Sequence, residues 1–473
     1  MPLLRAGFCN RSEKYKLIDC GRSRPCLLMK QLFGTDGIRG LAGEFPLDDK
    51  TVSTIGASLA KLLTDRLGRV PRFVSGRDTR ESGASIEAAF HAGATANGAV
   101  CESAGVITTP GVAYIANAFE FDAGIVISAS HNPFHDNGIK IFSPTGKKMS
   151  EATERLIEAE IYAGGEAASG TDLHDARAAE FCERYLEHLR EKIGDFSAAG
   201  IRIVLDCANG AASRLAPELF SSIGADVISI HDQPDGRNIN ENCGSLHLEH
   251  LQFRVVQEGA ALGVAFDGDA DRTLFVDERG VIVDGDATLW IMADYLQSHG
   301  KLSNSTVVAT VMSNIGLEIA LRSKGIDLLR TSVGDKYVLE QLIETRSEIG
   351  GEQSGHIIFP EISLVGDGMM TALLVLRAIT EKRVTLSQAF EGFTRFPQIL
   401  VNVKVGKKLP FESVPEIAAS SAEIEKELHG EGRLLLRYSG TENLARVMIE
   451  GKDQVEIESQ ANRLAGVIGS ALS

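Results

Sequence analysis

Long apolar segments are missing from this chain of 473 residues, and none approaches the roughly 18 residues needed to span a bilayer. The N-terminus has basic residues but lacks the apolar stretch of a secretory signal. Neither a P-loop motif nor a GxGxxG motif occurs, so nucleotide binding through these loops is disfavoured. These absences predict a cytoplasmic protein that does not act at a membrane.

Positive charge is also scarce, because 48 Lys and Arg stand against 64 Asp and Glu, for a net charge of −16. A nucleic-acid partner would need a basic patch that this composition does not indicate, whereas local charge can still bind a small anion. The seven cysteines are odd in number and contain no CxxC pair. That pattern argues against both a disulfide framework and a structural zinc site.

Strand-like and helix-like segments alternate from about residue 50 to residue 395, which is typical of α/β layers around a mostly parallel sheet. Three stretches share one order: a strand, a polar loop, a helix, and a glycine that opens the next strand. The first strands begin at Arg72, Ile201 and Val307, and the glycines are Gly98, Gly224 and Gly325. Their spacing is irregular, so we predict a repeated domain topology rather than a solenoid.

The two ends of the chain differ from this central region. Residues 401–405 alternate in polarity, residues 432–438 and 444–450 are strand-like, and the segment after residue 454 has a helical pattern. We therefore predict a separate C-terminal α+β domain. Residues 1–28 show no clear period, and we expect them to form a disordered extension.

The strongest chemical pattern is an acidic loop that follows the apolar strand predicted at residues 262–266. It contains Asp267, Asp269 and Asp271, separated by small residues. Three carboxylates at this spacing can converge on one hard divalent cation, and their repulsion is costly without one. Mg²⁺ usually fills its remaining positions with water and phosphate oxygens.

Two alternatives for this loop are an acidic surface turn and an EF-hand calcium loop. The EF-hand hypothesis has Glu278 at the twelfth position. It conflicts with Arg272, which stands where a glycine is needed, and with residues 273–277, which predict a strand instead of the exit helix.

A second pattern, residues 124–133, is a buried strand that runs into a loop with Ser130. Ligands collect at such strand ends in α/β sheets, and phosphoryl transfer suits a serine because the work is mainly positioning and charge neutralisation. His131 suggests a Ser/His hydrolase instead, but neighbours on an extended loop point to opposite sides, and no GxSxG motif occurs. Lys140, on the next predicted strand, is either solvated or faces a substrate.

Four glycine-containing loops carry further polar groups: residues 33–40, 76–80, 351–356 and 437–443. The second opens a helix whose N-terminus favours anions, the third offers groups that read sugar hydroxyls, and the fourth suits a phosphate. Each loop alone is more often a structural turn, but the set of four favours a ligand site.

Taken in chain order, these motifs resemble those of the α-D-phosphohexomutase superfamily, over about residues 29–473. The matching segments are residues 33–40, 128–133, 267–272, 351–356 and 437–441. Further segments resemble the bacterial members that act on glucosamine phosphates, namely residues 32–37, 312–314, 333–337, 352–354 and 396–403.

The resemblance implies three similar mixed-sheet α/β domains and a smaller α+β domain around a central cleft. The implied domains are 29–170 with a phosphoserine loop, 171–278 with a metal loop, 279–395 with a sugar-reading loop and 396–473 with a phosphate-binding loop.

The resemblance also implies an isomerase that interconverts glucosamine 6-phosphate and glucosamine 1-phosphate through a bisphosphate, for the synthesis of cell-wall amino-sugar nucleotides. Ser130 would carry a covalent phosphate and, with Asp267, Asp269 and Asp271, would hold one Mg²⁺. The implied partners are sugar phosphates, with neither nucleic acid nor a membrane. A kinase or a sugar bisphosphate, which the resemblance does not identify, would phosphorylate Ser130 first.

The other site residues follow from the same resemblance. Glu352 and Ser354 match the sugar-reading loop. Arg39, Lys140 and His356 match positions that relatives use for proton transfer or charge stabilisation. The phosphate-binding loop is matched by Arg437, Ser439, Gly440 and Thr441, with Arg446 nearby.

Two positions depart from the family pattern, since Ala270 replaces a glycine and Asn443 stands where proline is frequent. Three alternatives for the function stay open. They are phosphoglucomutase or phosphomannomutase activity, a non-catalytic sugar-phosphate binder, and a metal-dependent phosphatase.

Overall fold

A computed structural model describes residues 31–473 except 35, 166–167, 169, 171 and 440–441. The chain divides into two compact units, one at residues 32–394 and one that contains residues 395–473. The extension expected at residues 1–28 lies outside the described residues. Within the described part of the chain, no helix combines the length and the apolar character that a membrane crossing requires.

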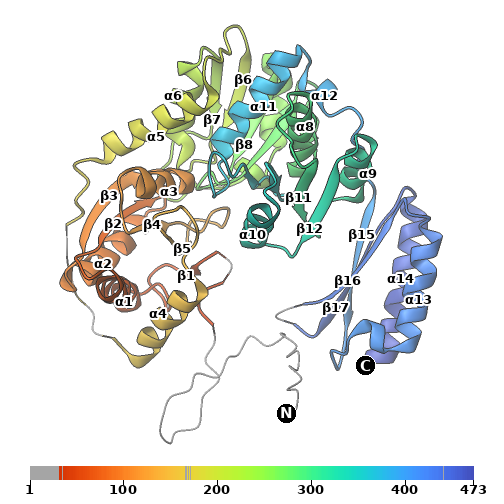
Figure 1. Ribbon diagram of the computed structural model, residues 1–473, viewed down its shortest axis with the longest axis horizontal. Coiled ribbons are helices and arrows are strands. Elements are labelled where there is room, and N and C mark those ends of the chain that lie inside the picture. The colour runs from red at the N-terminus through yellow and green to blue at the C-terminus, as the bar shows by residue number, and fades with distance from the viewer. Residues whose placement is uncertain (1–30, 35, 166–167, 169, 171, 440–441) are drawn as a thin grey trace, which may run out of the picture. The chain divides into compact units, whose positions relative to one another are not determined.

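The first sheet has the strand order β1-β5-β4-β2-β3, in which β2, β3 and β4 are parallel and β5 is antiparallel to both its neighbours (Figure 1). Its strands are β1 (Ile38–Leu41), β2 (Arg72–Arg77), β3 (Val100–Val106), β4 (Ala123–Ile127) and β5 (Asp136–Phe142). Its helices are α1 (Asp49–Leu67), α2 (Gly83–Ala96), α3 (Thr109–Ala118) and α4 (Glu151–Ala163). Phe73 and Ile125 pack with α1 and α2, whereas Val74 and Val126 pack with α3. Helices therefore cover both faces, as the alternation of side chains along a strand requires.

The second sheet has the order β10-β9-β8-β6-β7, again with three parallel strands and with β9 antiparallel to its neighbours. Its strands are β6 (Arg202–Asp206), β7 (Asp226–Ile230), β8 (Leu262–Phe266), β9 (Thr273–Asp277) and β10 (Ile282–Val283). The helices in this part of the chain are α5 (Ala178–Ile193), which contacts β3 of the first sheet, α6 (Ala212–Ser222), α7 (Glu249–Glu258) and the 3₁₀ turn η1 (Gly244–Leu246). The strand predicted in place of an EF-hand exit helix is confirmed as β9.

The third sheet is smaller and has the order β12-β11-β13-β14. Its strands are β11 (Thr306–Thr310), β12 (Asp327–Thr331), β13 (Gly350–Gly351) and β14 (Ile357–Ile358). Its helices are α8 (Gly285–Ser298), α9 (Ile315–Ser323), α10 (Asp335–Thr345), α11 (Gly368–Lys382) and α12 (Leu386–Ala389).

The predicted repeat of one topology is confirmed in these three sheets. β2, β6 and β11 each lie between two parallel strands, and each leads through one helix into the next strand. The glycine at that second junction has a positive φ in every copy: 86° at Gly98, 90° at Gly224 and 70° at Gly325. Glycine adopts this left-handed conformation at little cost because it has no Cβ, which explains why the pattern shows it there.

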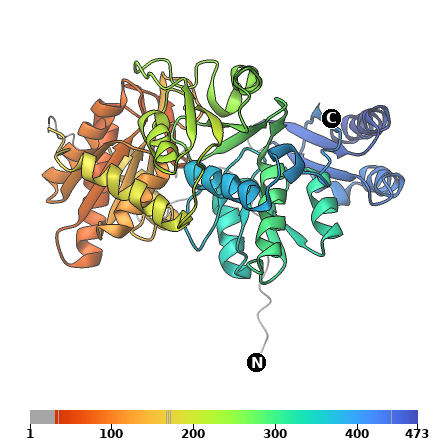
Figure 2. The same cartoon turned by 90° about the horizontal axis from the view of Figure 1, so that it is seen from above.

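The remaining unit contains an antiparallel sheet in the order β15-β17-β16. Its elements are β15 (Gln398–Lys404), η2 (Phe411–Ser413), α13 (Pro415–Glu427), β16 (Arg433–Tyr438), β17 (Leu444–Glu450) and α14 (Gln454–Leu472). The two helices lie side by side on the sheet (Figures 1 and 2). The predicted α+β character is confirmed. The sequence interpretation missed α13, whose buried residues are only Ile417 and Ile424.

Candidate active site and metal centre

Ser130 lies in the loop between β4 and β5 in a left-handed backbone conformation, with a φ of 53°. Its N–H donates to Ser128 Oγ at 2.9 Å, and Ser128 Oγ donates to Asp78 Oδ2 at 2.5 Å. The Ser130 carbonyl oxygen accepts hydrogen bonds from Arg80 Nη2 at 3.2 Å and from Asn240 Nδ2 at 2.9 Å. Arg80 also forms a buried ion pair with Asp78. Loops of the first two sheets therefore hold this strained backbone in place.

Asp267, Asp269 and Asp271 form a buried cluster between β8 and β9, in which one oxygen of each lies within 4.8 Å of the others. Oδ1 of Asp269 and Oδ1 of Asp271 are buried and accept no hydrogen bond within the described part of the chain. Burial, with the charges of Asp271 and Asp269, raises the pKa of Asp267 well above its usual range. Buried, convergent and partly unsatisfied oxygen donors suit a divalent metal ion.

The serine and the acidic loop meet, although they belong to different sheets. Ser130 Oγ donates a hydrogen bond to Asp267 Oδ2 at 2.5 Å. The two patterns that the sequence singled out most strongly therefore form one buried site.

His131 differs from its sequence-based interpretation, which placed it on the opposite side of the loop from Ser130. Its Nδ1 lies 3.3 Å from Ser130 Oγ, because the positive φ of Ser130 turns the chain. The same nitrogen lies 3.3 Å from Arg272 Nη1, and burial together with the Arg272 charge lowers the pKa of His131 to about 4. A hydrolase base needs a higher pKa and a carboxylate that orients it. The hydrolase alternative is therefore still disfavoured, but for a different reason.

Lys140, on β5, points into the site rather than into solvent. Its Nζ donates to Asp269 Oδ2 at 2.7 Å and to Asp271 Oδ2 at 3.2 Å. Burial lowers the pKa of Lys140, but the carboxylates of Asp269 and Asp271 outweigh that effect and raise it above its usual value. Lys140 is therefore a permanent cation beside the acidic cluster.

His356 follows the sugar-reading loop and approaches the cluster from the third sheet. Its Nδ1 lies 3.7 Å from Asp271 Oδ1, and the Gly366 N–H donates to its Nε2 at 3.1 Å. Burial lowers the pKa of His356, but Asp271, Asp335 and Glu352 together raise it, so the net shift is upward. The Gly366 hydrogen bond requires an unprotonated Nε2, so the geometry favours a proton on Nδ1, facing Asp271.

Arg39, on β1, belongs to a chain of ion pairs that links the first and third sheets. Arg39 Nη2 lies 3.2 Å from Asp36 Oδ2, and Lys148 Nζ bridges Asp36 Oδ1 at 2.8 Å and Asp335 Oδ1 at 2.7 Å. Burial raises the pKa of Asp36, but the Lys148 and Lys140 charges outweigh it and lower it far below its usual value. The Asp36 carboxylate is therefore ionised and ties Arg39 to this side of the site.

The loop at residues 351–356 packs against the metal loop, since Thr273 N–H donates to the Gly355 carbonyl at 3.1 Å. Glu352 Oε1 accepts from Gly334 N–H at 3.1 Å. Ser354 Oγ is buried and has no hydrogen-bond partner in the described chain. A buried hydroxyl without a partner is costly, which suits a group that binds a polar ligand.

In the other compact unit, Arg437 on β16 stands directly opposite Arg446 on β17. Burial and the Arg446 charge lower the pKa of Arg437. Ser439 is buried, and its carbonyl oxygen accepts from Lys408 Nζ at 2.7 Å. Like charges on opposite residues destabilise a strand pair unless an anion relieves them, so this pair of arginines suits a phosphate. The predicted residues Gly440 and Thr441 lie outside the described residues.

Comparison with known families identifies the family of the chain. Four family models, described as the three alpha/beta/alpha domains and the C-terminal domain of phosphoglucomutase/phosphomannomutase, match it in order, at residues 30–168, 183–280, 284–396 and 400–467. The chain belongs to the phosphoglucomutase/phosphomannomutase family. The predicted fold class, three α/β domains followed by a smaller one, is thereby confirmed.

Among its relatives in this family, the phosphoglucosamine mutases of Solibacter usitatus and Deinococcus deserti are each 47% identical to the chain. The matches cover 93% of this chain and 99% and 98% of those proteins. The phosphoglucosamine mutase of Caldicellulosiruptor bescii is 46% identical over 94% of this chain and 100% of that protein.

Solved structures share the phosphoglucomutase/phosphomannomutase fold. A family protein from Burkholderia thailandensis has a TM-score of 0.76 at 23% identity and covers 94% of this chain and 98% of its own. The N-acetylphosphoglucosamine mutase of Aspergillus fumigatus, solved with GlcNAc-6P and magnesium, has a TM-score of 0.64 at 19% identity, with coverages of 93% and 96%.

Some residues that shape this family site were not predicted from the sequence. Residues 76–80 were interpreted as an anion site, but Arg80 instead satisfies Asp78 and the Ser130 carbonyl, and α2 begins only at Gly83. Asn240, which also binds the Ser130 carbonyl, belongs to no motif.

One departure from the family pattern lies in the metal loop. The alanine that replaces the family's glycine, Ala270, has a φ of 55°, so a residue with a Cβ holds the left-handed conformation there.

Proposed function

We propose that the chain is a phosphoglucosamine mutase, which interconverts glucosamine 6-phosphate and glucosamine 1-phosphate. The observation that carries this proposal is the contact between Ser130 Oγ and the buried acidic cluster at Asp267. It is supported by relatives of that name that match nearly the whole chain. We further propose that the protein works in the cytoplasm, within the synthesis of amino-sugar nucleotides for the cell wall.

The proposed metal is one Mg²⁺, held by Asp267, Asp269, Asp271 and an oxygen of Ser130. The donors fit this ion, because the cluster offers carboxylate oxygens, two of which are buried and accept no hydrogen bond in the described chain. The Aspergillus fumigatus relative was solved with magnesium. Bound there, the ion would supply positive charge that stabilises a transferring phosphoryl group.

In the proposed reaction Ser130, previously phosphorylated, gives its phosphoryl group to a hydroxyl of the sugar phosphate. The bond between phosphorus and Oγ breaks, a bond to the sugar oxygen forms, and the sugar hydroxyl proton passes in net terms to Oγ. The resulting bisphosphate turns, and its other phosphate returns to Ser130. Such transfers depend on positioning and on fixed charge. The network of Asp78, Arg80 and Asn240 supplies the positioning, and the Lys140 ammonium group supplies fixed charge.

The same proposal assigns Glu352 and Ser354 to the sugar. Ser354 Oγ has no hydrogen-bond partner in the described chain, so a sugar hydroxyl or amine would satisfy it. We propose that Arg39 and His356 stabilise charge beside the acidic cluster. We also propose the domain borders that the resemblance implies, which follow residues 170, 278 and 395.

A turning bisphosphate requires a second phosphate site, which we assign to Arg437, Ser439, Gly440, Thr441 and Arg446. Replacing Arg437 with alanine should raise KM at least about tenfold, because a charge-assisted phosphate contact contributes roughly 1.5–3 kcal/mol. Steady-state kinetics and circular dichroism measure the effect and confirm the fold. Arg463→Ala, which removes an ion pair between α14 and Glu427 at the end of α13, is the matched control and should leave KM unchanged. An unchanged KM in Arg437→Ala would remove this assignment.

Phosphorus NMR of the two glucosamine phosphates, with the phosphorylated enzyme and Mg²⁺, tests the function directly. We expect interconversion without net release of inorganic phosphate. We also expect a kcat/KM at least about 10²-fold above that for glucose or mannose phosphates, since a pocket built for an amine rejects the hydroxyl analogue. Equal constants would favour the phosphoglucomutase/phosphomannomutase alternative. Phosphate release at the isomerisation rate would favour a phosphatase, and binding without turnover a non-catalytic binder.

A further inference from the structure

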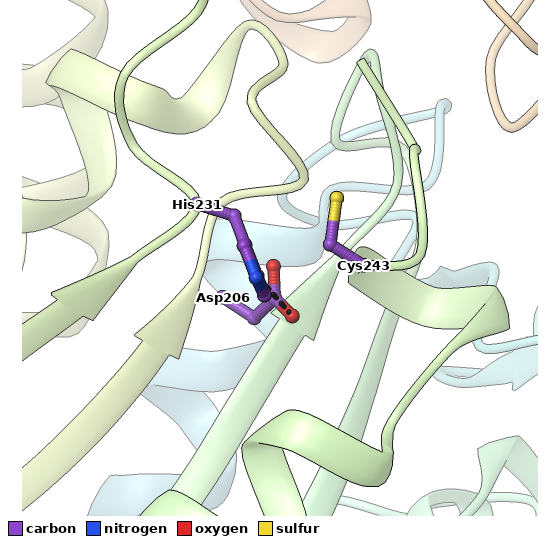
Figure 3. Close-up of side chains that lie close together, drawn as sticks. All are labelled: Asp206, His231 and Cys243. Carbon is purple, nitrogen blue, oxygen red and sulfur yellow. Dashed lines mark ion pairs between the residues drawn. The ribbon is translucent and has the colours of Figure 1, made fainter. Parts of the chain in front are cut away.

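A second cluster of metal-ligating side chains lies in the second sheet and takes no part in the proposed reaction. Asp206 ends β6, His231 follows β7, and Cys243 precedes η1, so three separate segments contribute (Figure 3). One donor atom from each residue lies within 4.8 Å of the others. Asp206 and Cys243 are buried, whereas the His231 side chain is 22% exposed. The cluster is thus enclosed by the protein but accessible from solvent at His231.

The donor atoms lie close together, and two of them, on His231 and Asp206, form an ion pair (Figure 3). His231 Nδ1 lies 3.1 Å from Asp206 Oδ2 and is paired with it, although the geometry is not that of an aligned hydrogen bond. The 3.1 Å between this nitrogen and this oxygen also fits two ligands of one ion, since ligand bonds of about 2.0–2.3 Å place tetrahedral ligands three to four ångströms apart.

The surroundings orient the donors as they do in metal sites. His250 Nδ1 lies 3.1 Å from His231 Nε2, which leaves Nδ1 as the nitrogen that faces the cluster. Asp206 Oδ1 accepts from Ala208 N–H and Oδ2 accepts from Gly244 N–H, both at 3.0 Å. The contact at Nε2 fixes the direction of the His231 ring, and the two N–H donors hold the Asp206 carboxylate in place.

We propose that Asp206, His231 and Cys243 bind one borderline transition-metal ion of the Zn²⁺ class, separately from the magnesium site. The donor set decides the class of ion. A thiolate, an imidazole and one carboxylate favour Zn²⁺ or Co²⁺, whereas the three carboxylates at Asp267 favour Mg²⁺. On binding, the Cys243 thiol loses its proton to solvent as the metal–sulfur bond forms, and water completes the coordination.

The site lies next to the backbone that supports Ser130. Asn240 N–H donates to the Ala208 carbonyl at 2.9 Å, and the Asn240 side chain holds the Ser130 carbonyl. Ala211 N–H donates to the Gly268 carbonyl at 2.8 Å. An ion that joins the loop after β6 to the loop before η1 would therefore stabilise the walls of the active site. The sequence alone does not indicate this metal site, because its three ligands are far apart in the chain.

The test is a titration of the full chain with Co²⁺, which replaces Zn²⁺ and gives a visible spectrum. Mg²⁺ in large excess keeps the acidic cluster occupied. A parallel chain with Cys9, Cys20 and Cys26 replaced by serine removes the thiols of the N-terminal segment. We expect a near-ultraviolet thiolate-to-cobalt band that saturates at one equivalent in both chains, with a rise in melting temperature.

Cys243→Ser should abolish this band, and His231→Gln should weaken Co²⁺ binding at least about tenfold. Cys101→Ser, at another buried cysteine, is the matched control and should keep the band. Absence of the band at millimolar Co²⁺, or its survival in Cys243→Ser, would overturn the proposal.

Because a core variant can fail to fold, X-ray absorption of the Zn²⁺-loaded native chain gives a second readout. One sulfur ligand at about 2.3 Å supports the site, and a shell of oxygen and nitrogen alone rejects it. Mutase activity is no part of either readout, so failure of this proposal and failure of the proposed function are distinguishable.

Discussion

Replacement of Ser130 by alanine should reduce the interconversion of the two glucosamine phosphates at least about 10³-fold, since removal of a catalytic nucleophile has effects of this size or larger. Alanine has no atom that can carry the phosphoryl group. The fold should persist, because the backbone contacts of Ser130 with Arg80 and Asn240 do not use the side chain. A coupled assay for the product, with circular dichroism of the same sample, measures both expectations.

The matched control is Ser85→Ala, which removes a serine whose Oγ bonds only to the Ser82 carbonyl among the described residues. That variant should keep full activity. If Ser130→Ala also retained most of its turnover while the fold was intact, Ser130 would not be the phosphoryl carrier.

Replacement of Asp269 by asparagine should weaken Mg²⁺ binding at least about 10²-fold and reduce turnover by a similar factor, because a ligand charge is lost from a site that depends on three. The variant also leaves Lys140 with one carboxylate instead of two at hydrogen-bond distance. Asn is preferred to Ala here because it keeps the side-chain volume and an oxygen that can accept from Lys140 Nζ.

Isothermal titration calorimetry with Mg²⁺ measures the affinity, beside kinetics at several metal concentrations. Asp226→Asn, which removes one charge from an exposed ion pair with Arg202, controls for the change in net charge and should bind Mg²⁺ normally. Unchanged Mg²⁺ affinity in Asp269→Asn would show that this carboxylate is no ligand.

The repeated α/β topology was predictable because its determinants are local. Each copy has an apolar strand, a polar loop, a helix and a glycine in a left-handed junction, and each feature leaves a pattern in neighbouring residues. The C-terminal sheet was predictable for the same reason. The α13 helix was not, because its two buried isoleucines are seven positions apart and give a weak period.

The candidate site was predictable only in part, because its contacts cross between sheets. The acidic spacing indicated a metal loop, and the strand-end position indicated Ser130, but only the resemblance joined them. Arg80 and Asn240 donate hydrogen bonds to the carbonyl oxygen of Ser130. Every residue type has this oxygen, so the residue at position 130 does not indicate these contacts. The position of His131 depends on one positive φ, which the sequence around a serine does not reveal.

The central claim is that Ser130 lends a phosphoryl group to the sugar and takes one back. Enzyme carrying ³²P on Ser130, mixed with unlabelled glucosamine 1-phosphate, measures this most directly. The account predicts that the label leaves Ser130 within one turnover and appears in the bisphosphate and in glucosamine 6-phosphate, while unlabelled phosphate replaces it on the same peptide. Label that stays on the protein while substrate is converted would contradict the account.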